Sequence, residues 1–464
     1  MPSAESTIAD AGRAAARNAP CPCGSGRRYK ACCGAVRTPG DADAIVGAPA
    51  EGAHGGSMQQ ALLLHKAGHL AAAEARYREA LADAPGLADA LHMLGVICLQ
   101  AGDSLAAMHL LRRAGDAFSW RLPAVRQNLG LALASVVAGR NHEAVAALWA
   151  GYDRYREELQ RAARPVAPRV GVVIPSYDHA GYIDAALESV YAQTYRDIEI
   201  VVIDDGSTDG SVAVIERALA RSPFPARFMA RANRGAAPTI NEAVAMCDAP
   251  FINVLNSDDR FAPTRVQAMV DAVAGTGSAW GFSRVEMTDA AGAVRARAAS
   301  PRVTLLHDLI AAVAASDTVG ASFLSANGAI TSGALFVSRL LFDRLGGFRD
   351  LRYTHDWDFC LRASVEAEPV FVASPQYLYR MHERNTILEA AAGVQVETGA
   401  MQLDFHRAAM ATRAPANPFA PVPAVWGARY FAQLMANANV VHFTPEMLAC
   451  VCDGIAQLCA DAPE

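Results

Sequence analysis

Between residues 169 and 255, short apolar runs typical of buried strands alternate with amphipathic stretches typical of helices. A chain that alternates in this way is predicted to form a parallel sheet with right-handed crossovers. An α/β domain is therefore expected here, entered through a proline-containing linker at 164–169. The predicted strands are 169–174, 199–203, 227–230 and 251–255, and the predicted helices are 182–193, 211–220 and 238–245.

The pattern from residue 58 to about 160 is helical, and it repeats. Small or apolar residues recur 34 positions apart, as the pairs Gly68 and Gly102, Ala73 and Ala107, Tyr77 and Leu111, and Ala80 and Ala114. A third, looser repeat is indicated by Leu129, Gly130, Leu133, Ala144 and Leu148. This period resembles that of tetratricopeptide repeats, which implies a surface for a protein partner, a protein acceptor or dimerisation. Generic helical hairpins are the alternative.

The N-terminal segment carries two close cysteine pairs across a Gly/Ser turn. Such spacing can place four thiolates around one tetrahedral Zn²⁺. Residues 21–34 resemble the SEC-C motif, and in that pattern the zinc ligands are Cys21, Cys23, Cys32 and Cys33. We expect residues 1–20 to be disordered and residues 38–57, rich in Gly, Ala and Pro, to form a flexible tether.

Chain length limits the number of domains, and net charge limits the kinds of partner that we expect. A chain of 464 residues has room for about three domains. Its formal net charge of −6 argues against nucleic acid as the main partner. The best apolar run, 305–315, is interrupted by His307 and Asp308, so no membrane span is expected and peripheral association stays open. The N-terminus lacks a signal-peptide pattern, which predicts a cytoplasmic protein.

Carboxylates follow two of the predicted strands. Asp204 and Asp205 come after the second strand, and Asp258 and Asp259 after the strand at 251–255. Ligands of open α/β sheets bind outside the carboxyl ends of the strands. Carboxylate oxygens suit Mg²⁺ or Mn²⁺, which also takes oxygens from substrate phosphates. A polar turn that caps a helix beginning near Thr264 is the alternative interpretation of the second pair.

Seven short stretches in one order resemble family 2 glycosyltransferases of the GT-A fold. They are 172–177, 201–209, 233–235, 254–259, 345–348, 355–358 and 379–382. The resemblance implies a Rossmann-like nucleotide-diphospho-sugar transferase domain. It also implies that the nucleotide-sugar donor is bound by Pro175, Tyr177, Asp204, Asp205, Arg234, Asn256 and Ser257. We expect Ser207, Thr208 and Asp209 only to cap the helix that follows them.

Two positions depart from the family pattern. The metal motif usually reads Asp-x-Asp, but its first position here is Asn256. Asp258 is then expected to be the main ligand of Mn²⁺ or Mg²⁺, helped by His382, for which a structural role near the end of a strand is the open alternative. His355 stands where the family commonly has an acidic residue, and Asp356 beside it remains as the implied general base. For Trp357, packing and a platform for the acceptor are both open.

These features together predict a metal-dependent inverting transferase that moves a sugar, UDP-linked by family preference, to a hydroxyl acceptor, which includes a protein as one option. The alternative is a scaffold that has lost catalysis through Asn256 and binds partners through the repeats and the zinc motif. Four segments are expected: 1–57 with the zinc motif, 58–163 with the helical repeats, 164–386 with the GT-A domain, and a helical region at 387–464.

Overall fold

The computed structural model describes residues 55–138, 151, 154, 157, 167–383, 385, 391–436 and 443–460. The chain divides into two compact units, one formed by 1–142 with 434–464 and the other by 143–433. The C-terminal segment at 387–464 is therefore shared between the two units. The zinc-motif cysteines Cys21, Cys23, Cys32 and Cys33 lie outside the described residues.

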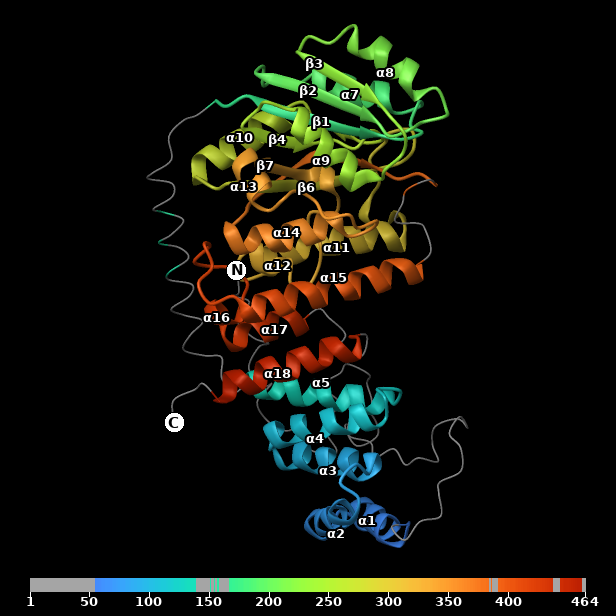
Figure 1. Ribbon diagram of the computed structural model, residues 1–464, viewed down its shortest axis with the longest axis vertical. Coiled ribbons are helices and arrows are strands. Elements are labelled where there is room, and N and C mark those ends of the chain that lie inside the picture. Colours follow the sequence, from blue (N-terminus) through green and yellow to red (C-terminus); the bar gives the residue numbers. More distant parts are fainter. Residues whose placement is uncertain are drawn as a thin grey trace, which may run out of the picture. The chain divides into compact units, whose positions relative to one another are not determined.

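The elements of the first unit in the residues that the structure describes are helices (Figure 1). Its N-terminal helices are α1 (Gly55–Ala67), α2 (Leu70–Asp83), α3 (Ala88–Ala101), α4 (Ser104–Ala117) and α5 (Pro123–Ala138). The last residues of α1 and α2 recur 34 positions later as the last residues of α3 and α4, which matches the period in the sequence. Gly68 and Gly102 follow α1 and α3 with left-handed φ angles of 85° and 86°, a backbone conformation that glycine adopts without strain.

The repeated positions form the core of these hairpins. Each successive pair of helices from α1 to α5 packs together. The small residues Ala73, Ala80, Ala107 and Ala114 are at most 1% exposed, which allows the helices to approach closely. Helix α18 (Pro445–Ala460), from the far end of the chain, packs against α4 and α5 and pairs Asp453 with Arg112. The tetratricopeptide assignment itself stays a prediction.

The second unit contains an eight-stranded mixed sheet with strand order β3-β2-β1-β4-β7-β6-β8-β5. The first half, β3-β2-β1-β4, is parallel. The strands and helices expected between 169 and 255 are confirmed, each end to within two residues. They are β1 (Val170–Ser176), α7 (Ile183–Tyr191), β2 (Ile198–Asp204), α8 (Ser211–Leu219), β3 (Ala226–Ala230), α9 (Ala236–Met246) and β4 (Phe251–Val254).

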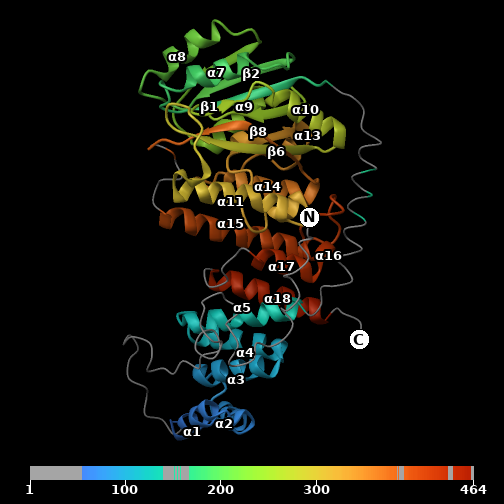
Figure 2. The same ribbon diagram turned by 180° about the vertical axis from the view of Figure 1, so that it is seen from behind.

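The second half of the sheet departs from the expected parallel pattern, because β7 runs antiparallel to both β4 and β6, and β5 runs antiparallel to β8. Helices lie on both faces of the whole sheet, as the two opposite views show (Figure 1, Figure 2). The elements are β5 (Arg260–Phe261), α10 (Arg265–Thr276), β6 (Trp280–Thr288), α11 (Pro301–Ala315), α12 (Val319–Ser322), β7 (Leu335–Ser338), α13 (Arg339–Arg344), α14 (His355–Glu366) and β8 (Val370–Arg380).

Beyond the sheet, the described residues are mostly helical, as the sequence predicts. They form α15 (Ala391–Ala411), α16 (Pro423–Trp426) and α17 (Ala428–Ala436). Helix α15 packs against α14 and α16. None of the helices in the described ranges is long and apolar enough to cross a membrane. The predicted fold class is confirmed as an α/β unit with a separate helical region, and the sheet of the α/β unit is mixed.

Candidate functional site

The site lies where the strand order reverses. The chain moves outward from β1 to β2 and β3, and then returns to place β4 on the other side of β1. The loops that leave β1 and β4 therefore diverge, which creates the crevice where ligands bind in open α/β sheets. One loop carries His179, and the other carries Asp258. The β5–β8 pairing places residues 260–261 beside 377–378, so the end of β8 also reaches this crevice.

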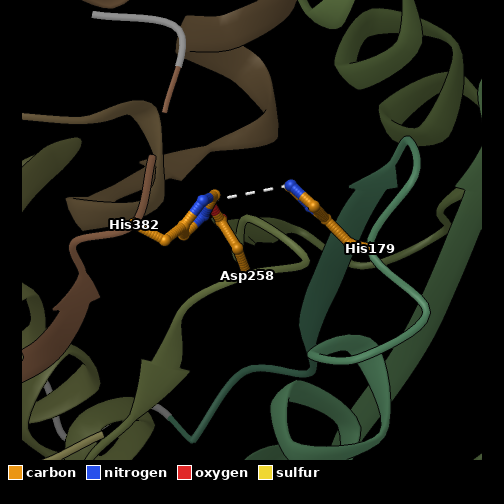
Figure 3. A group of neighbouring side chains, drawn as sticks. All are labelled: His179, Asp258 and His382. Atoms are coloured by element: carbon orange, nitrogen blue, oxygen red, sulfur yellow. Dashed lines mark hydrogen bonds and ion pairs between the residues drawn. The ribbon is translucent and has the colours of Figure 1, made fainter. Parts of the chain in front are cut away.

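Three side chains from these loops point toward one another (Figure 3). Asp258 Oδ2 lies 3.0 Å from His382 Nε2 and 4.0 Å from His179 Nε2. The ligand atoms of all three residues lie within 4.8 Å of one another, close enough for one metal ion. The structure thus brings Asp258 and His382 together, as the sequence predicts, and adds His179. The side chain of Asp258 is 12% exposed and that of His382 is 4% exposed.

The pKa values of the adjacent carboxylates Asp258 and Asp259 are shifted in opposite directions. Burial works to raise the pKa of Asp258, but the hydrogen bond from His382 and the charges of both histidines leave it below its ordinary value. Burial and the charge of Asp258 raise the pKa of Asp259 well above its usual range. Asp259 accepts hydrogen bonds from the Tyr377 hydroxyl and the Arg380 backbone N–H, each at 2.7 Å. Asp258 is thus the ionised carboxylate, while Asp259 anchors the end of β8.

Asn256 is directed into the protein. Its Nδ2 donates to Thr331 Oγ1 at 2.7 Å and to Asp259 Oδ2 at 3.3 Å, and its Oδ1 accepts from Ser332 Oγ at 3.2 Å. Ser257 is 2% exposed and bonds through its hydroxyl to His179 Nδ1 at 2.8 Å. Both residues of the expected donor site therefore already have protein partners.

Asp204 and Asp205 also hold the protein's own loops. Asp204 accepts the backbone N–H and the hydroxyl of Ser207, at 2.8 and 2.6 Å. Asp205 accepts the backbone N–H of Arg234 at 2.8 Å and that of Gly235 at 2.9 Å, and it pairs with the Arg231 guanidinium. Each carboxylate has about four acceptor positions, so these bonds do not exhaust them.

The remaining donor-site candidates are accessible. Pro175 is half-buried near the end of β1, and Tyr177 directly after that strand is 48% exposed. The Arg234 side chain is 64% exposed and lies 3.9 Å from Glu242. Asp209 accepts the N–H of Ser211 at the start of α8 and also the N–H of Ala180. The turns after β1 and β2 are thereby joined. The N-cap of α8, however, is Gly210, which makes no side-chain cap, so the capping role expected of 207–209 is not observed.

Asp356 lies in the first turn of α14, where the helix dipole favours a negative charge. Burial raises its pKa, while the charge of His355, the N–H of Trp357 and the Asn327 side chain act in the opposite direction. The Trp357 indole N–H donates to the Phe323 carbonyl at 2.8 Å, which supports the packing role for that residue.

The start of α14 is held from two sides. On one side, Asp358 pairs with Arg362, whose guanidinium donates to the carbonyls of Leu345 and Gly347, each at 2.9 Å. On the other side, Glu397 of α15 accepts the backbone N–H groups of 352, 353 and 354 at 2.7 to 2.9 Å, together with the Thr354 hydroxyl. Burial works against ionisation, but these bonds leave the pKa of Glu397 below its ordinary value.

The Tyr379 phenol is near the end of β8. Its pKa is raised by burial first, and then by the charges of Asp259, Asp258 and Asp356. Asp258 and Asp356 therefore both lie within electrostatic range of one phenol near the end of β8.

Sequence reasoning missed His179, Asn327, Tyr377, Arg380 and Glu397. His179 could have been found, because it lies two residues beyond Tyr177 in the loop after the first strand, where ligands of such sheets bind. Histidine is also the commonest metal ligand in proteins. Glu397 gave no signal, since it lies on a helix without a recognisable motif.

Comparison with protein families gives two matches. Residues 171–308 match the family described as glycosyl transferase family 2. Residues 17–35 match the SEC-C motif. The first match covers β1 to α11 and includes the loops that carry His179 and Asp258, while Asp356 and His382 lie beyond it.

Curated relatives match stretches of 100 to 120 residues of the chain. A chondroitin synthase of Escherichia coli is 34% identical over 120 residues, 26% of this chain and 17% of that protein. An uncharacterised glycosyltransferase of Nostoc is 36% identical over 103 residues, 22% of this chain and 32% of that protein. A hyaluronan synthase of Pasteurella multocida is 36% identical over 100 residues, 22% of this chain and 10% of that protein. The chain thus spans at most about a third of the length of these relatives.

Solved structures give weaker similarity. The mannosyltransferase PcManGT from Pyrobaculum calidifontis, in complex with GDP-Man and Mn²⁺, is 19% identical with a TM-score of 0.41 over 72% of this chain and 88% of that one. Residues 1–349 of S. aureus TarS, in complex with UDP, are 16% identical with a TM-score of 0.40 over 51% of this chain and 65% of that one.

Proposed function

We propose that this protein is a metal-dependent, inverting glycosyltransferase that uses a nucleotide-sugar donor. The proposed donor is UDP-linked, by family preference. The observation that carries the proposal is the carboxylate–imidazole cluster at the strand-order reversal of a sheet whose residues 171–308 match family 2 glycosyltransferases. An ionised carboxylate and imidazoles that converge on one point suit a divalent cation, and such a cation would bind the diphosphate of a donor.

The donor's nucleoside would lie over Tyr177 and the turns after β1 and β2. Asp204 and Asp205 shape this region, and each retains acceptor capacity for a base or a ribose hydroxyl. Arg234, with its exposed guanidinium, would contact the base or the diphosphate. Asn256 and Ser257 would act mainly by holding the loop that presents Asp258.

Asp356 would be the general base. Its carboxylate takes the proton of the acceptor hydroxyl while that oxygen forms a bond to the donor's C1. The bond between C1 and the diphosphate oxygen breaks at the same time, and its electron pair leaves with the diphosphate. Asp258 and His382 would hold Mn²⁺ or Mg²⁺, and the bound ion would neutralise the charge that grows on this leaving group.

A donor screen followed by two variants tests the proposal. With Mn²⁺ present, a true donor at 100 times its Kd should stabilise the protein by about 2.7 kcal/mol, which thermal unfolding detects. Asp356→Asn should keep this shift but turn over about 10²- to 10⁴-fold more slowly. Asp258→Ala should lose the shift. If none of a panel of UDP-, GDP- and dTDP-sugars shifts the unfolding temperature with Mn²⁺ or Mg²⁺, the proposal is wrong.

The acceptor and the partners are further parts of the proposal. The helical unit would bind a partner protein or present a protein acceptor. An open hollow of about 360 Å³ lies between α2, α3 and α4 and is lined in part by Glu74, Arg78 and His109. Cys21, Cys23, Cys32 and Cys33 would bind one Zn²⁺, supported by the SEC-C match. The cytoplasmic location stays a prediction from the sequence.

A scaffold without catalysis is the second candidate, and the state of Asn256 favours it. This residue contributes no charge, and its amide is committed to Thr331, Ser332 and Asp259. If this alternative holds, hydrolysis of the donor in the presence of Mn²⁺ should proceed at the same background rate in wild type, Asp258→Ala and Asp356→Asn.

A further inference from the structure

The third member of the cluster, His179, is presented in the manner of a metal ligand. Its Nδ1 is 2.8 Å from the Ser257 hydroxyl, and its Nε2 faces Asp258 Oδ2 at 4.0 Å. When Nδ1–H donates to Ser257, Nε2 carries the lone pair on the side of the carboxylate. A hydrogen bond at the far nitrogen is the arrangement that fixes the tautomer and orientation of metal-binding histidines.

The loop that carries His179 is rigidly joined to the next turn of the chain. The backbone N–H of His179 donates to Ser211 Oγ at 3.0 Å, and its neighbours Asp178 and Ala180 donate to Ser207 Oγ and Asp209 Oδ2. Tyr182 contacts both imidazoles, stacked on His382 at 5.0 Å between ring centroids and edge-on to His179 at 5.8 Å. Both rings are therefore held in place by the protein.

The spacing of the three ligand atoms suits one ion. Around an octahedral ion with bonds of about 2.1 Å, neighbouring ligands are about 3 Å apart and opposite ones about 4.2 Å. Asp258 Oδ2 lies 3.0 Å from His382 Nε2 and 4.0 Å from His179 Nε2, so both separations are within that span, and all three ligand atoms lie within 4.8 Å of one another. The remaining positions of the ion would be open to phosphate oxygens and water.

We propose that His179 takes the place of the carboxylate missing at Asn256, so that His179, Asp258 and His382 together bind one divalent ion and favour Mn²⁺, Co²⁺ or Zn²⁺ over Mg²⁺. Two imidazole ligands suit these ions, whereas Mg²⁺ prefers oxygen ligands throughout. The set carries one negative charge, so the loaded site keeps a net charge of about +1 and attracts a diphosphate more strongly than a site with two carboxylates. The inference rests on the proposed function for the role of that ion in donor binding.

Mn²⁺ alone, without a donor, tests the ligand set. His179→Asn is the main variant, because the Asn amide can still donate to Ser257 while the Nε2 ligand is lost. Titration followed by electron paramagnetic resonance should show Mn²⁺ affinity at least tenfold weaker in His179→Asn than in wild type. Spin-echo measurements on bound Mn²⁺ should detect two coupled imidazole nitrogens in wild type and one in the variant. His69→Asn, an exposed residue of the helical unit, is the matched control and should change neither measurement.

Competition and a second substitution complete the test. Mg²⁺ should displace bound Mn²⁺ from wild type only at an excess of at least tenfold. Asn256→Asp should fail to improve Mg²⁺ binding, because the side chain at 256 is directed toward Thr331 and Ser332. Unchanged Mn²⁺ affinity and nitrogen coupling in a folded His179→Asn variant, with tighter Mg²⁺ binding in Asn256→Asp, would overturn the inference even if a donor binds. If His179→Asn loses one coupled imidazole nitrogen but no donor binds the wild-type protein, the ligand set is supported and the proposed function is wrong.

Discussion

In two loops beside the candidate site one carboxylate accepts several backbone N–H groups, and the two carboxylates come from very different places in the sequence. Asp205 accepts the backbone N–H groups of Arg234 and Gly235 and lies directly after β2. Glu397 accepts those of residues 352–354 and lies on α15, more than 40 positions downstream of the loop that it holds. The chemistry is the same, since an ionised acceptor satisfies several loop amides at once.

The difference falls between the side proposed to bind the donor and the side that carries the proposed general base. Asp205 belongs to the regular parallel half of the sheet, where each strand end carries its own functional loop. Glu397 stands outside the sheet and positions the turn that precedes Asp356. The proposed donor site is therefore held by contacts close in sequence, whereas the position of the proposed general base depends on packing between α14 and α15.

Breaking the Glu397 contacts should have the larger effect. Glu397→Ala leaves three loop amides without their acceptor, and the turn before Asp356 should lose its fixed position. We expect kcat to fall by about 10- to 10²-fold with the donor KM unchanged, because small misplacements of a catalytic group cost rates of this size. Steady-state kinetics measure the split.

The neighbouring Val396, 75% exposed on the same helix, provides the control, and Val396→Ser should behave as wild type. Glu397→Gln keeps one acceptor oxygen and should recover part of kcat. If Glu397→Ala raised the donor KM and left kcat unchanged, Glu397 would act on donor binding. The two loops would then not differ in function.

Breaking the Asp205 contacts should act on donor binding. Asp205→Asn loses the ion pair with Arg231 and one acceptor for the loop at 234–235. A hydrogen bond to a charged group is worth about 1.5–3 kcal/mol, so donor Kd should rise about tenfold or more while kcat changes little. Calorimetric titration of the donor measures the change. Asp197→Asn, in an exposed pair with Arg169, should leave donor Kd unaltered.

The pH dependence of kcat sharpens the assignment of Asp356. A general base must be ionised, and burial raises the pKa of this carboxyl above the ordinary value of about 3.9. Activity should therefore fall as pH decreases through a value above that of an ordinary aspartate. Asn327→Ala removes a hydrogen bond that favours the ionised form, so the acid limb should move to still higher pH. An acid limb that stays in place would show that another group limits the rate.

The smallest expected effect is the coupling between the two loops. Asp205 and Glu397 share no hydrogen-bonding partner among the described contacts. In the double variant, the effects on kcat/KM should add to within about 0.5 kcal/mol. A larger interaction energy would mean that the donor loop and the catalytic turn move as one body.

The contrast also explains what the sequence could predict. The order of strands and helices from 169 to 255 followed from apolar runs, and the proximity of Asp258 to the end of β8 followed from the family resemblance. The inward direction of Asn256 could not be predicted, because its partners Thr331 and Ser332 lie about 75 residues away in a loop without a readable pattern. The mixed half of the sheet was missed for a related reason, since β7 pairs with strands on both sides through long-range contacts.

Helix α18 has a consequence for biosynthesis. The side chains of Leu448, Val451 and Ile455 are at most 2% exposed, and the helix packs on α4 and α5. About 300 residues separate the end of α5 at 138 from the start of α18 at 445. At about 5–20 residues per second, a ribosome needs about 15–60 s to make this interval. During that time the apolar surface of α4 and α5 that α18 covers is exposed to solvent. Chaperones that bind exposed apolar surfaces should therefore associate with the nascent chain before α18 is synthesised.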